Sequence, residues 1–158
     1  MADLHPNCVL INSILQSAGL PGRVRILAEA APTAVAAAEQ LGVEVAAIVN
    51  SLVFTTAERS PLLVLTSGAH RVDTARVATL VGTAKLSRAT AEFVREVTGQ
   101  PIGGVAPIGH PAPIRTLLDT ALLEFPEIWA AGGIPHAVFG ISYPDLLALT
   151  SAQPAIVA

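Results

Sequence analysis

The hydrophobic positions of this chain repeat with two different periods, and these periods predict helices and strands in one domain. Apolar residues at helical spacing, bounded by residues that start or stop helices, predict the helices. They are expected at residues 6–19, 33–42, 71–82, 90–99 and 143–150. Short apolar or alternating runs predict the strands. They are expected at residues 22–27, 47–56, 61–68, 84–89, 114–119, 127–133 and 136–142.

The connections between these elements favour antiparallel pairing of neighbouring strands. The segment AERS at residues 57–60 separates two strands, and the segment 132–135 (GGIP) joins two others. Both are typical of hairpins. Strands and helices do not alternate strictly, so the sheet is expected to be mixed or largely antiparallel. With 158 residues, we predict a single α/β domain over residues 1–158, with helices flanking the sheet.

One polar residue interrupts a strand that is otherwise built for a core. In the run IVNSLVF, Asn50 lies between Val49 and the apolar residues that follow Ser51. A buried amide without a hydrogen-bond partner costs about 1–3 kcal/mol. Asn50 must therefore face solvent, bond to a neighbouring loop or line a pocket, and the residue pattern leaves these three alternatives open.

Composition excludes several classes of protein. Hydrophobic residues make up 52% of the chain and charged residues 13%, which excludes a disordered chain. The longest apolar run, Val45–Phe54, is broken by Asn50 and Ser51 and is shorter than the ~18 residues of a membrane span. The N-terminal segment lacks the pattern of a signal peptide. We therefore expect a cytoplasmic protein without a membrane partner.

Cysteine and histidine usage indicates neither a disulfide nor a metal centre. The single Cys8 cannot form an internal disulfide, which fits a reducing compartment. The four histidines are scattered, and no His or Cys pair has the spacing of metal ligands. We expect no metal site.

The net charge limits how a nucleic acid could be bound. The formal net charge is -3 and the calculated pI is about 5.7, whereas proteins that hold nucleic acid by bulk charge are usually basic. A nucleic-acid partner would have to be held by a local patch, in a pocket or through another protein.

The segment TGQPIGGVAPIGHPAP at residues 98–113 is the first candidate for chemistry. Consecutive glycines such as Gly103 and Gly104 allow backbone N–H groups to approach an anion or a developing oxyanion. The segment matches neither a P-loop nor a dinucleotide fingerprint. His110, which follows Gly109, could act as an acid, a base or a ligand donor. The alternatives are an ordinary long connection and a solvated histidine.

Two further polar residues lie at the ends of predicted elements. His70 precedes a predicted helix, where it can simply decorate the helix entrance. Asp119 ends a predicted strand, where a carboxylate commonly caps the next element. No Ser lies in a G-x-S-x-G elbow, and the aromatic residues are too sparse for a base-stacking platform.

The order of motifs resembles the YbaK family, also called the aminoacyl-tRNA synthetase-associated domain. This family consists of free-standing relatives of the editing domain that is inserted in bacterial prolyl-tRNA synthetase. The motifs are TAVAAAEQLGVEVAAIVNSLVF, PLLVLTSGAHRVD, AKLSRATAEFVREVTGQPIGGVAPIGH, TLLD and AAGG, in this order from Thr33 onward. The combination of TG-x-x-x-GGV-x-P-x-G with the upstream I-x-x-SLVF carries the resemblance.

The resemblance implies a twisted, mostly antiparallel sheet or barrel with flanking helices. It also implies trans-editing, which is hydrolysis of the ester between a wrong amino acid and the 3′-terminal adenosine of tRNA. The expected substrates are of the prolyl-tRNA type, and no metal or organic cofactor is needed. By analogy, prolyl-tRNA synthetase could deliver the charged tRNA.

The resemblance also implies a set of site residues. Gly103 and Gly104 fall in the loop that lines the aminoacyl site of the family, and Asn50 occupies the position of a Lys that is regarded as central to activity. The only lysine here, Lys85, lies in another predicted strand. We predict Asn50, Gly103 and Gly104 as catalytic residues. The substrate-binding candidates are Val105, Pro107, Gly109, His110, His70 and Asp119.

Two alternatives to a tRNA deacylase remain at this point. A module of the same fold could bind a tRNA end or a synthetase without catalysis, because the family Lys is missing. A hydrolase of other small esters is the second alternative, because fold-level likeness does not determine function.

Overall fold

The computed structural model describes residues 4–158, which form five α-helices, two short 3₁₀ helices and one eight-stranded sheet. The helices are α1 (Pro6–Ser17), α2 (Ala34–Leu41), α3 (Thr74–Val81), α4 (Ala91–Thr98) and α5 (Tyr143–Thr150), with the 3₁₀ helices η1 (Val45–Ala47) and η2 (Thr120–Glu124). The strands are β1 (Arg25–Ile26), β2 (Ile48–Thr56), β3 (Pro61–Ser67), β4 (Leu86–Arg88), β5 (Arg115–Asp119), β6 (Ile128–Ala131), β7 (Ala137–Ile141) and β8 (Gln153–Ala155). None of these helices combines the length and apolar character that a membrane crossing requires.

The sheet is mixed, with the strand order β1-β7-β6-β2-β3-β5-β8 and with β4 paired to β2 outside this path. Both predicted hairpins, β2–β3 and β6–β7, are antiparallel, as are the pairs β1–β7 and β2–β4. The pairs β2–β6, β3–β5 and β5–β8 are parallel. The predicted fold class, a mixed and mostly antiparallel sheet with flanking helices, is confirmed.

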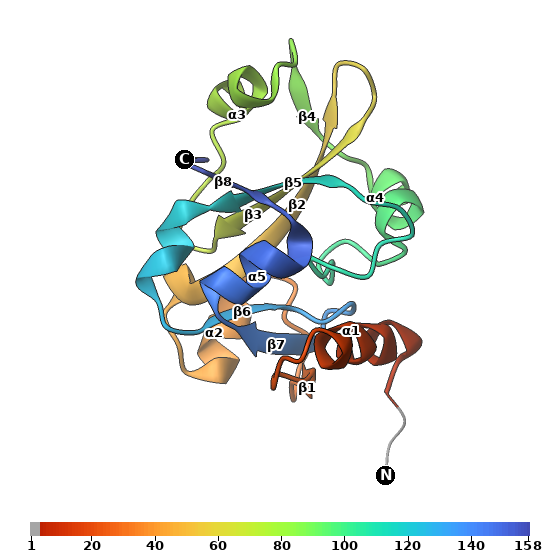
Figure 1. Cartoon of the computed structure of the whole chain (residues 1–158), viewed down its shortest axis with the longest axis vertical. Coiled ribbons are helices and arrows are strands. Elements are labelled where there is room, and N and C mark those ends of the chain that lie inside the picture. The colour runs from red at the N-terminus through yellow and green to blue at the C-terminus, as the bar shows by residue number, and fades with distance from the viewer. Residues whose placement is uncertain (1–3) are drawn as a thin grey trace.

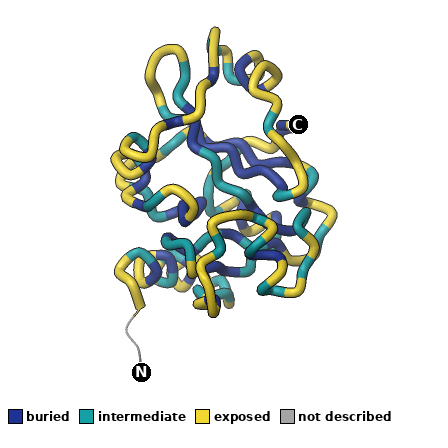
Figure 2. The backbone as a smooth tube through the Cα atoms, turned by 180° about the vertical axis from the view of Figure 1, so that it is seen from behind, coloured by how far each residue is buried: buried dark blue, intermediate teal, exposed yellow. Residues whose placement is uncertain are grey.

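Helices cover both faces of the sheet, which explains why β3 is almost continuously apolar. Leu63 and Leu65 belong to the larger core, which also receives side chains from α1, α4 and α5. Leu62 and Val64 point to the opposite face and pack with residues of α3. A strand buried on both faces reads as an apolar run rather than as an alternation. Figure 2 shows a buried centre, with most of the exposed backbone lying around it.

Local signals place the helix ends correctly. Thr33, Asp73 and Thr90 cap the N-termini of α2, α3 and α4 by accepting a backbone N–H. Each of these helices ends at a Gly in the left-handed conformation. The predicted strand at 22–27 contracts to β1, and the one at 84–89 contracts to β4. Strand β8 and helix η1 have no predicted counterpart.

One edge of β2 is shared by two strands that leave an opening between them. β6 pairs with β2 at Ile48 and Val49, and β4 pairs with it from Phe54 to Thr56. Among the described strands, none pairs with residues 50–52 on this edge. Figure 1 shows β6 near one end of β2 and β4 near the other. The sheet therefore opens beside the polar pair Asn50 and Ser51.

Candidate functional site

A pocket of about 470 Å³ occupies this opening, and we call it the β2 pocket. Residues 48–52 of β2 and residues 129–131 of β6 line it. Arg88, at the end of β4, also lines it. Segment 31–34 before and at the start of α2, the loop residues Ile102, Gly103 and Val105, and residues around 134–138 complete the wall.

The wall of the β2 pocket is mainly apolar and carries few polar side chains. The polar lining residues are Thr33, Asn50, Ser51 and Arg88, together with the indole of Trp129. No Asp, Glu or His from the described chain is part of the lining. A cleft with apolar walls and a few polar groups is the usual form of a small-ligand site.

Asn50 lines the β2 pocket, and this resolves the three alternatives left open by the sequence. The residue is half-buried, and its side chain makes no hydrogen bond to the rest of the described chain. Among residues 4–158, Ser51 Oγ is the one buried side-chain polar atom without a hydrogen-bond partner. The Asn50 amide also lacks a partner but is not in this class, so it is open to solvent. Asn50 thus presents a free donor and a free acceptor to a ligand.

The structure brings Gly103 and Val105 to the same pocket as Asn50. Gly103 has φ of +87°, a conformation that favours glycine. Neither the Gly103 N–H nor the Val105 N–H donates a hydrogen bond within the described residues. Two unpaired amides from alternate residues of a loop can stabilise negative charge on a ligand oxygen.

Gly104 serves the loop rather than the pocket surface. Its N–H already donates to Pro101 O at 2.9 Å, and the residue is buried outside the lining. A Cβ at this position would lie 2.5 Å from the carbonyl carbon of Ile134. Ile134 itself lines the pocket, so Gly104 sets how closely the loop approaches that wall.

Pro107, Gly109 and His110 lie farther along the loop and do not line the pocket. His110 Nε2 donates to Ala106 O at 2.9 Å. Burial lowers the pKa of His110, an effect partly opposed by this hydrogen bond. Gly109 packs against Ile11 of α1, where a Cβ would lie 3.1 Å from that side chain. The structure therefore places these candidates in the support of the loop.

Gln100 holds this loop in place from within, a role that no sequence pattern indicated. The residue is 2% exposed. Its Nε2 donates to Ile108 O at 3.1 Å, and its Oε1 accepts from Ala106 N. Both bonds join backbone groups several residues away, so a single side chain fixes the path of residues 100–108. A lone polar residue in a Gly/Pro-rich segment does not reveal such a bond before the loop is folded.

We expect Gln100→Ala to lower the free energy of unfolding by about 2 kcal/mol or more, because it leaves two buried backbone groups unpaired. The matched control is Gln40→Ala. Gln40 makes the same pair of bonds with the backbone of Glu29, at an exposed site. Water can replace those bonds, so the control should lose less than about 1 kcal/mol. Denaturant unfolding of both variants measures the difference, and equal losses would contradict a bracing role.

The lowered pKa of His110 predicts a pH-dependent stability. Above the ordinary histidine value near 6.5, His110 is neutral in both the folded and the unfolded chain. As the pH falls below this value, the unfolded chain binds a proton that the folded chain resists, so stability is lost with decreasing pH. Denaturant unfolding between pH 7.5 and 5 should show a shallower loss in His110→Gln than in the unchanged protein. Parallel profiles would contradict this origin.

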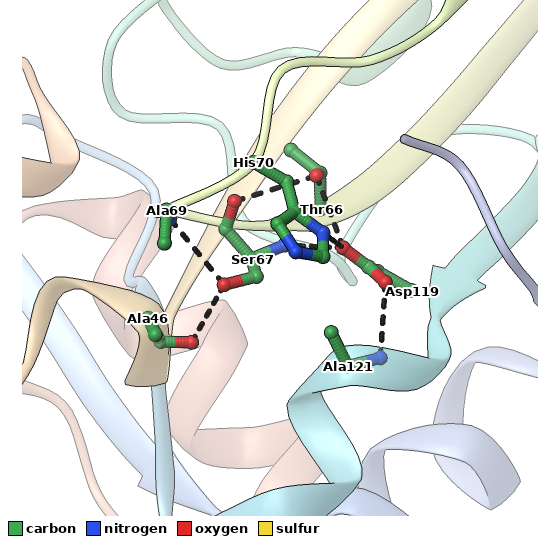
Figure 3. Close-up of polar contacts among 7 residues, drawn as sticks. All are labelled: Ala46, Thr66, Ser67, Ala69, His70, Asp119 and Ala121. Carbon is green, nitrogen blue, oxygen red and sulfur yellow. Dashed lines mark hydrogen bonds and ion pairs between the residues drawn. The ribbon is translucent and has the colours of Figure 1, made fainter.

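His70 and Asp119 meet at the ends of β3 and β5, outside the lining of the β2 pocket (Figure 3). Asp119 is 2% exposed and accepts from Ser67 N at 3.0 Å, from Thr66 Oγ at 3.3 Å and from Ala121 N at 3.0 Å. The bond to Ala121 caps η2, as expected for a strand-end carboxylate. His70 Nδ1 lies 2.9 Å from the same carboxylate, and its side chain is 37% exposed. Through these bonds the Asp119 carboxylate connects the end of β3, the segment at His70 and the start of η2.

Arg88 is the charged residue of the β2 pocket, and sequence reasoning missed it. Lys85 is exposed and lies outside the lining, whereas Arg88, three residues later, lines the pocket. The Arg88 guanidinium lies 5.7 Å from the ring centre of Phe54, which favours one orientation of the arginine. It forms no ion pair within residues 4–158. Its charge is available to a ligand at the pocket.

Comparison with known proteins identifies the family. A family model described as an aminoacyl-tRNA editing domain matches residues 28–149 of the chain. The chain belongs to the aminoacyl-tRNA editing domain family. The matched residues contain Asn50, Gly103, Val105 and Arg88, so the whole set of polar groups described at the β2 pocket lies within the editing domain.

Two solved structures share the fold of this editing domain over nearly its whole length. A protein proposed to be a trans-editing enzyme for prolyl tRNA synthetase is 43% identical, with a TM-score of 0.90 and 98% of each chain covered. A protein used as a scaffold for computational epitope grafting is 39% identical, also with a TM-score of 0.90 and 98% of each chain covered.

The proline–tRNA ligase of Maridesulfovibrio salexigens is 32% identical over 127 residues. The match covers 73% of this chain and 21% of the ligase, so the chain corresponds to a small part of that enzyme.

Proposed function

We propose that this editing domain is a trans-editing deacylase, which hydrolyses the ester between a wrongly attached amino acid and the 3′ end of tRNA. One observation carries the proposal. Asn50, Gly103 and Val105 line a single pocket, and the N–H groups of Gly103 and Val105 donate no hydrogen bond within the described residues, in a chain that belongs to the aminoacyl-tRNA editing domain family.

The reaction is attack of water on the ester carbonyl carbon. The carbonyl oxygen becomes an oxyanion, the bond to the ribose oxygen breaks, and the free amino acid and the tRNA hydroxyl are released. The N–H groups of Gly103 and Val105 stabilise the oxyanion. Asn50 accepts a hydrogen bond from the attacking water and holds it in line with the carbonyl carbon.

The proton that the water loses has no protein base to receive it at the pocket lining, because Asn50 does not titrate and no His, Asp or Glu of the described chain lines the pocket. The neighbouring ribose hydroxyl of the terminal adenosine passes the proton to the leaving oxygen. An aminoacyl ester is already activated, so positioning and oxyanion stabilisation supply the acceleration.

The β2 pocket supports selection by size. Its lining combines the small Ala34, Ala37 and Ala130 with the larger Ile48 and Trp129. A site of this kind admits a small apolar side chain and excludes a larger one. Arg88 is placed to pair with a phosphate of the terminal nucleotides, which lets a chain of net charge -3 hold the end of a tRNA locally.

Substrates of the prolyl-tRNA type are the first expectation, supported by the likeness to the proposed trans-editing enzyme and to the ligase. A panel of mischarged tRNAs tests the proposal by following loss of the aminoacyl ester over the uncatalysed rate. We expect turnover of at least one tRNA-Pro carrying a small amino acid. Binding without turnover of any substrate would favour a non-catalytic tRNA-end module. Equal activity on simple amino-acid esters would favour a general esterase.

A further inference from the structure

The opening in the sheet exposes the backbone N–H and C=O groups of one β2 residue to the β2 pocket. Gly68 N–H donates to Ile48 O at 2.8 Å, and Thr56 N–H donates to Ser60 O at 2.9 Å, both within the β2–β3 hairpin. Backbone groups of successive strand residues point to opposite edges. The register between β2 and β3 is continuous from Val49 to Thr55. The backbone N–H and C=O groups of even-numbered β2 residues therefore form the hydrogen bonds to β3.

The backbone N–H and C=O groups of odd-numbered β2 residues point to the other edge of the strand. Val53 O accepts from Ala89 N at 3.1 Å on that edge, and Val49 pairs with Ala130 of β6. Ser51 lies between these two positions, and neither β4 nor β6 pairs with it. Its N–H and C=O thus point together into the opening, where Ser51 lines the β2 pocket. One hydrogen-bonded pair of the sheet is therefore absent at Ser51, and we call this position the missing rung.

In the proposed mechanism the Asn50 side-chain oxygen accepts from the attacking water, so another group must accept from the amine of the aminoacyl ester. Its α-ammonium is a charged donor, and the described lining contains no carboxylate to receive it. A cation placed against apolar walls needs an acceptor, because burial of an unpaired charge is unfavourable. A backbone carbonyl that lacks a partner is such an acceptor, and Ser51 supplies one.

We propose that the amino-acid part of the substrate fills the missing rung by pairing with the backbone of Ser51. In an antiparallel ladder, two facing residues exchange both N–H···O bonds. An α-aminoacyl group has the same donor and acceptor as a strand residue, with the amine in place of the N–H and the ester carbonyl in place of the amide carbonyl. Ser51 C=O accepts from the ammonium, and Ser51 N–H donates to the ester carbonyl oxygen.

This pairing deepens the proposed function and rests on it. The ester carbonyl is then oriented by Ser51 N–H before water attacks, while the N–H groups of Gly103 and Val105 approach the same oxygen as negative charge develops. The pairing makes a free α-amine part of the recognised substrate. The domain should therefore distinguish aminoacyl-tRNA from N-acylated aminoacyl-tRNA and from esters of hydroxy acids.

The first test compares binding of non-hydrolysable analogues, so that it does not depend on turnover. The probes are 3′-amino-3′-deoxyadenosine acylated with alanine, with N-acetylalanine or with lactic acid. We expect the alanyl amide to bind about tenfold or more tightly than the other two, as is typical of a hydrogen bond to a charged group. The lactyl probe keeps the size of the alanyl probe, so it separates the loss of charge from a steric effect. Equal affinities would overturn the proposal.

Amide chemical shifts in the same titration locate the contact. The Ser51 amide should shift on binding of the alanyl probe, whereas the Thr66 amide of β3 should shift little, because Thr66 is fully buried outside the pocket lining. Shifts at other pocket residues with an unchanged Ser51 amide would also overturn the proposal.

Turnover separates failure of this proposal from failure of the proposed function. The best substrate of the mischarged panel is compared with its N-acetylated form, each rate being divided by the uncatalysed rate. Hydrolysis of the free-amine form alone supports both proposals. Equal acceleration of the two forms would leave deacylation in place and overturn pairing at Ser51. If neither form is hydrolysed, the deacylase proposal fails, and the binding test still decides the role of Ser51.

A proline substitution tests the backbone directly. Ser51→Pro removes an N–H that does not belong to the β2–β3 ladder, so the strand should still fold. We expect its deacylation rate to fall about 100-fold, in the range seen for loss of one backbone-type donor to a carbonyl oxygen. The control Leu52→Pro removes an N–H that points to β3, and its unfolding midpoint should drop well below that of Ser51→Pro. A folded Ser51→Pro protein with full activity would contradict the proposal. If this variant does not fold, the chemical shift of the Ser51 amide in the unchanged protein, titrated with the alanyl probe, decides instead.

Discussion

Asn50→Ala should reduce kcat/KM for deacylation about 100-fold or more while the melting temperature stays nearly unchanged. The side chain makes no hydrogen bond to the rest of the described chain and lines the β2 pocket, so its removal leaves no buried partner unsatisfied. In the proposed mechanism, however, the attacking water loses the group that positions it, and misplacement of a reacting group commonly costs a factor of about 100. Single-turnover hydrolysis and thermal unfolding of the same preparation measure the two effects.

The matched control for this variant is Asn12→Ala. Asn12 is also half-buried, but it lies in α1 outside the lining of the β2 pocket, and its Oδ1 accepts from Val24 N at 2.7 Å. Its loss should lower the free energy of unfolding by about 1 kcal/mol or more and leave the deacylation rate of the folded protein unchanged. Full activity in Asn50→Ala would remove Asn50 from the mechanism.

Local patterns were sufficient for the helices and hairpins but not for the parallel pairs of the sheet. Caps such as Thr90 and stops such as Gly99 act within one turn, so their effect is visible in the sequence. The pairing of β5 with β3 joins Leu118 to Leu65 across more than 50 residues, and no short-range signal encodes it. Strand β8 was missed because it is three residues long and contains Pro154, which is common at a sheet edge.

The parallel pairing of β6 with β2 also creates the opening that forms the β2 pocket. Asn50 stood out in the sequence because it interrupts an apolar run, and the family resemblance linked it to Gly103. Arg88 and the backbone of Ser51 gave no signal, because their place at the β2 pocket depends on which residues of β2 pair with β4 and β6. A backbone group becomes a candidate for binding only when its partner strand is known to be missing.

Asp119→Ala should be strongly destabilising, by about 3 kcal/mol or more. The carboxylate accepts from two backbone N–H groups, from Thr66 Oγ and from His70, and its removal leaves Ser67 N and Ala121 N without their acceptor in a buried site. Each buried unpaired donor costs about 1–3 kcal/mol. Asp119→Asn should recover only part of this loss, since one oxygen is replaced by an amide nitrogen that cannot accept.

The paired variant His70→Ala separates a structural role of Asp119 from a role in substrate binding. His70 is 37% exposed and water can replace it at the carboxylate, so we expect it to cost about 1 kcal/mol or less. If the cluster only fastens β3 and β5 to η2, the folded fraction of each variant should retain the deacylation rate, because the cluster lies outside the β2 pocket. If His70 and Asp119 contact the tRNA, His70→Ala should instead raise KM at unchanged stability. Denaturant unfolding combined with rates at two tRNA concentrations distinguishes these results, because one role is expressed in the unfolding midpoint and the other in the substrate dependence.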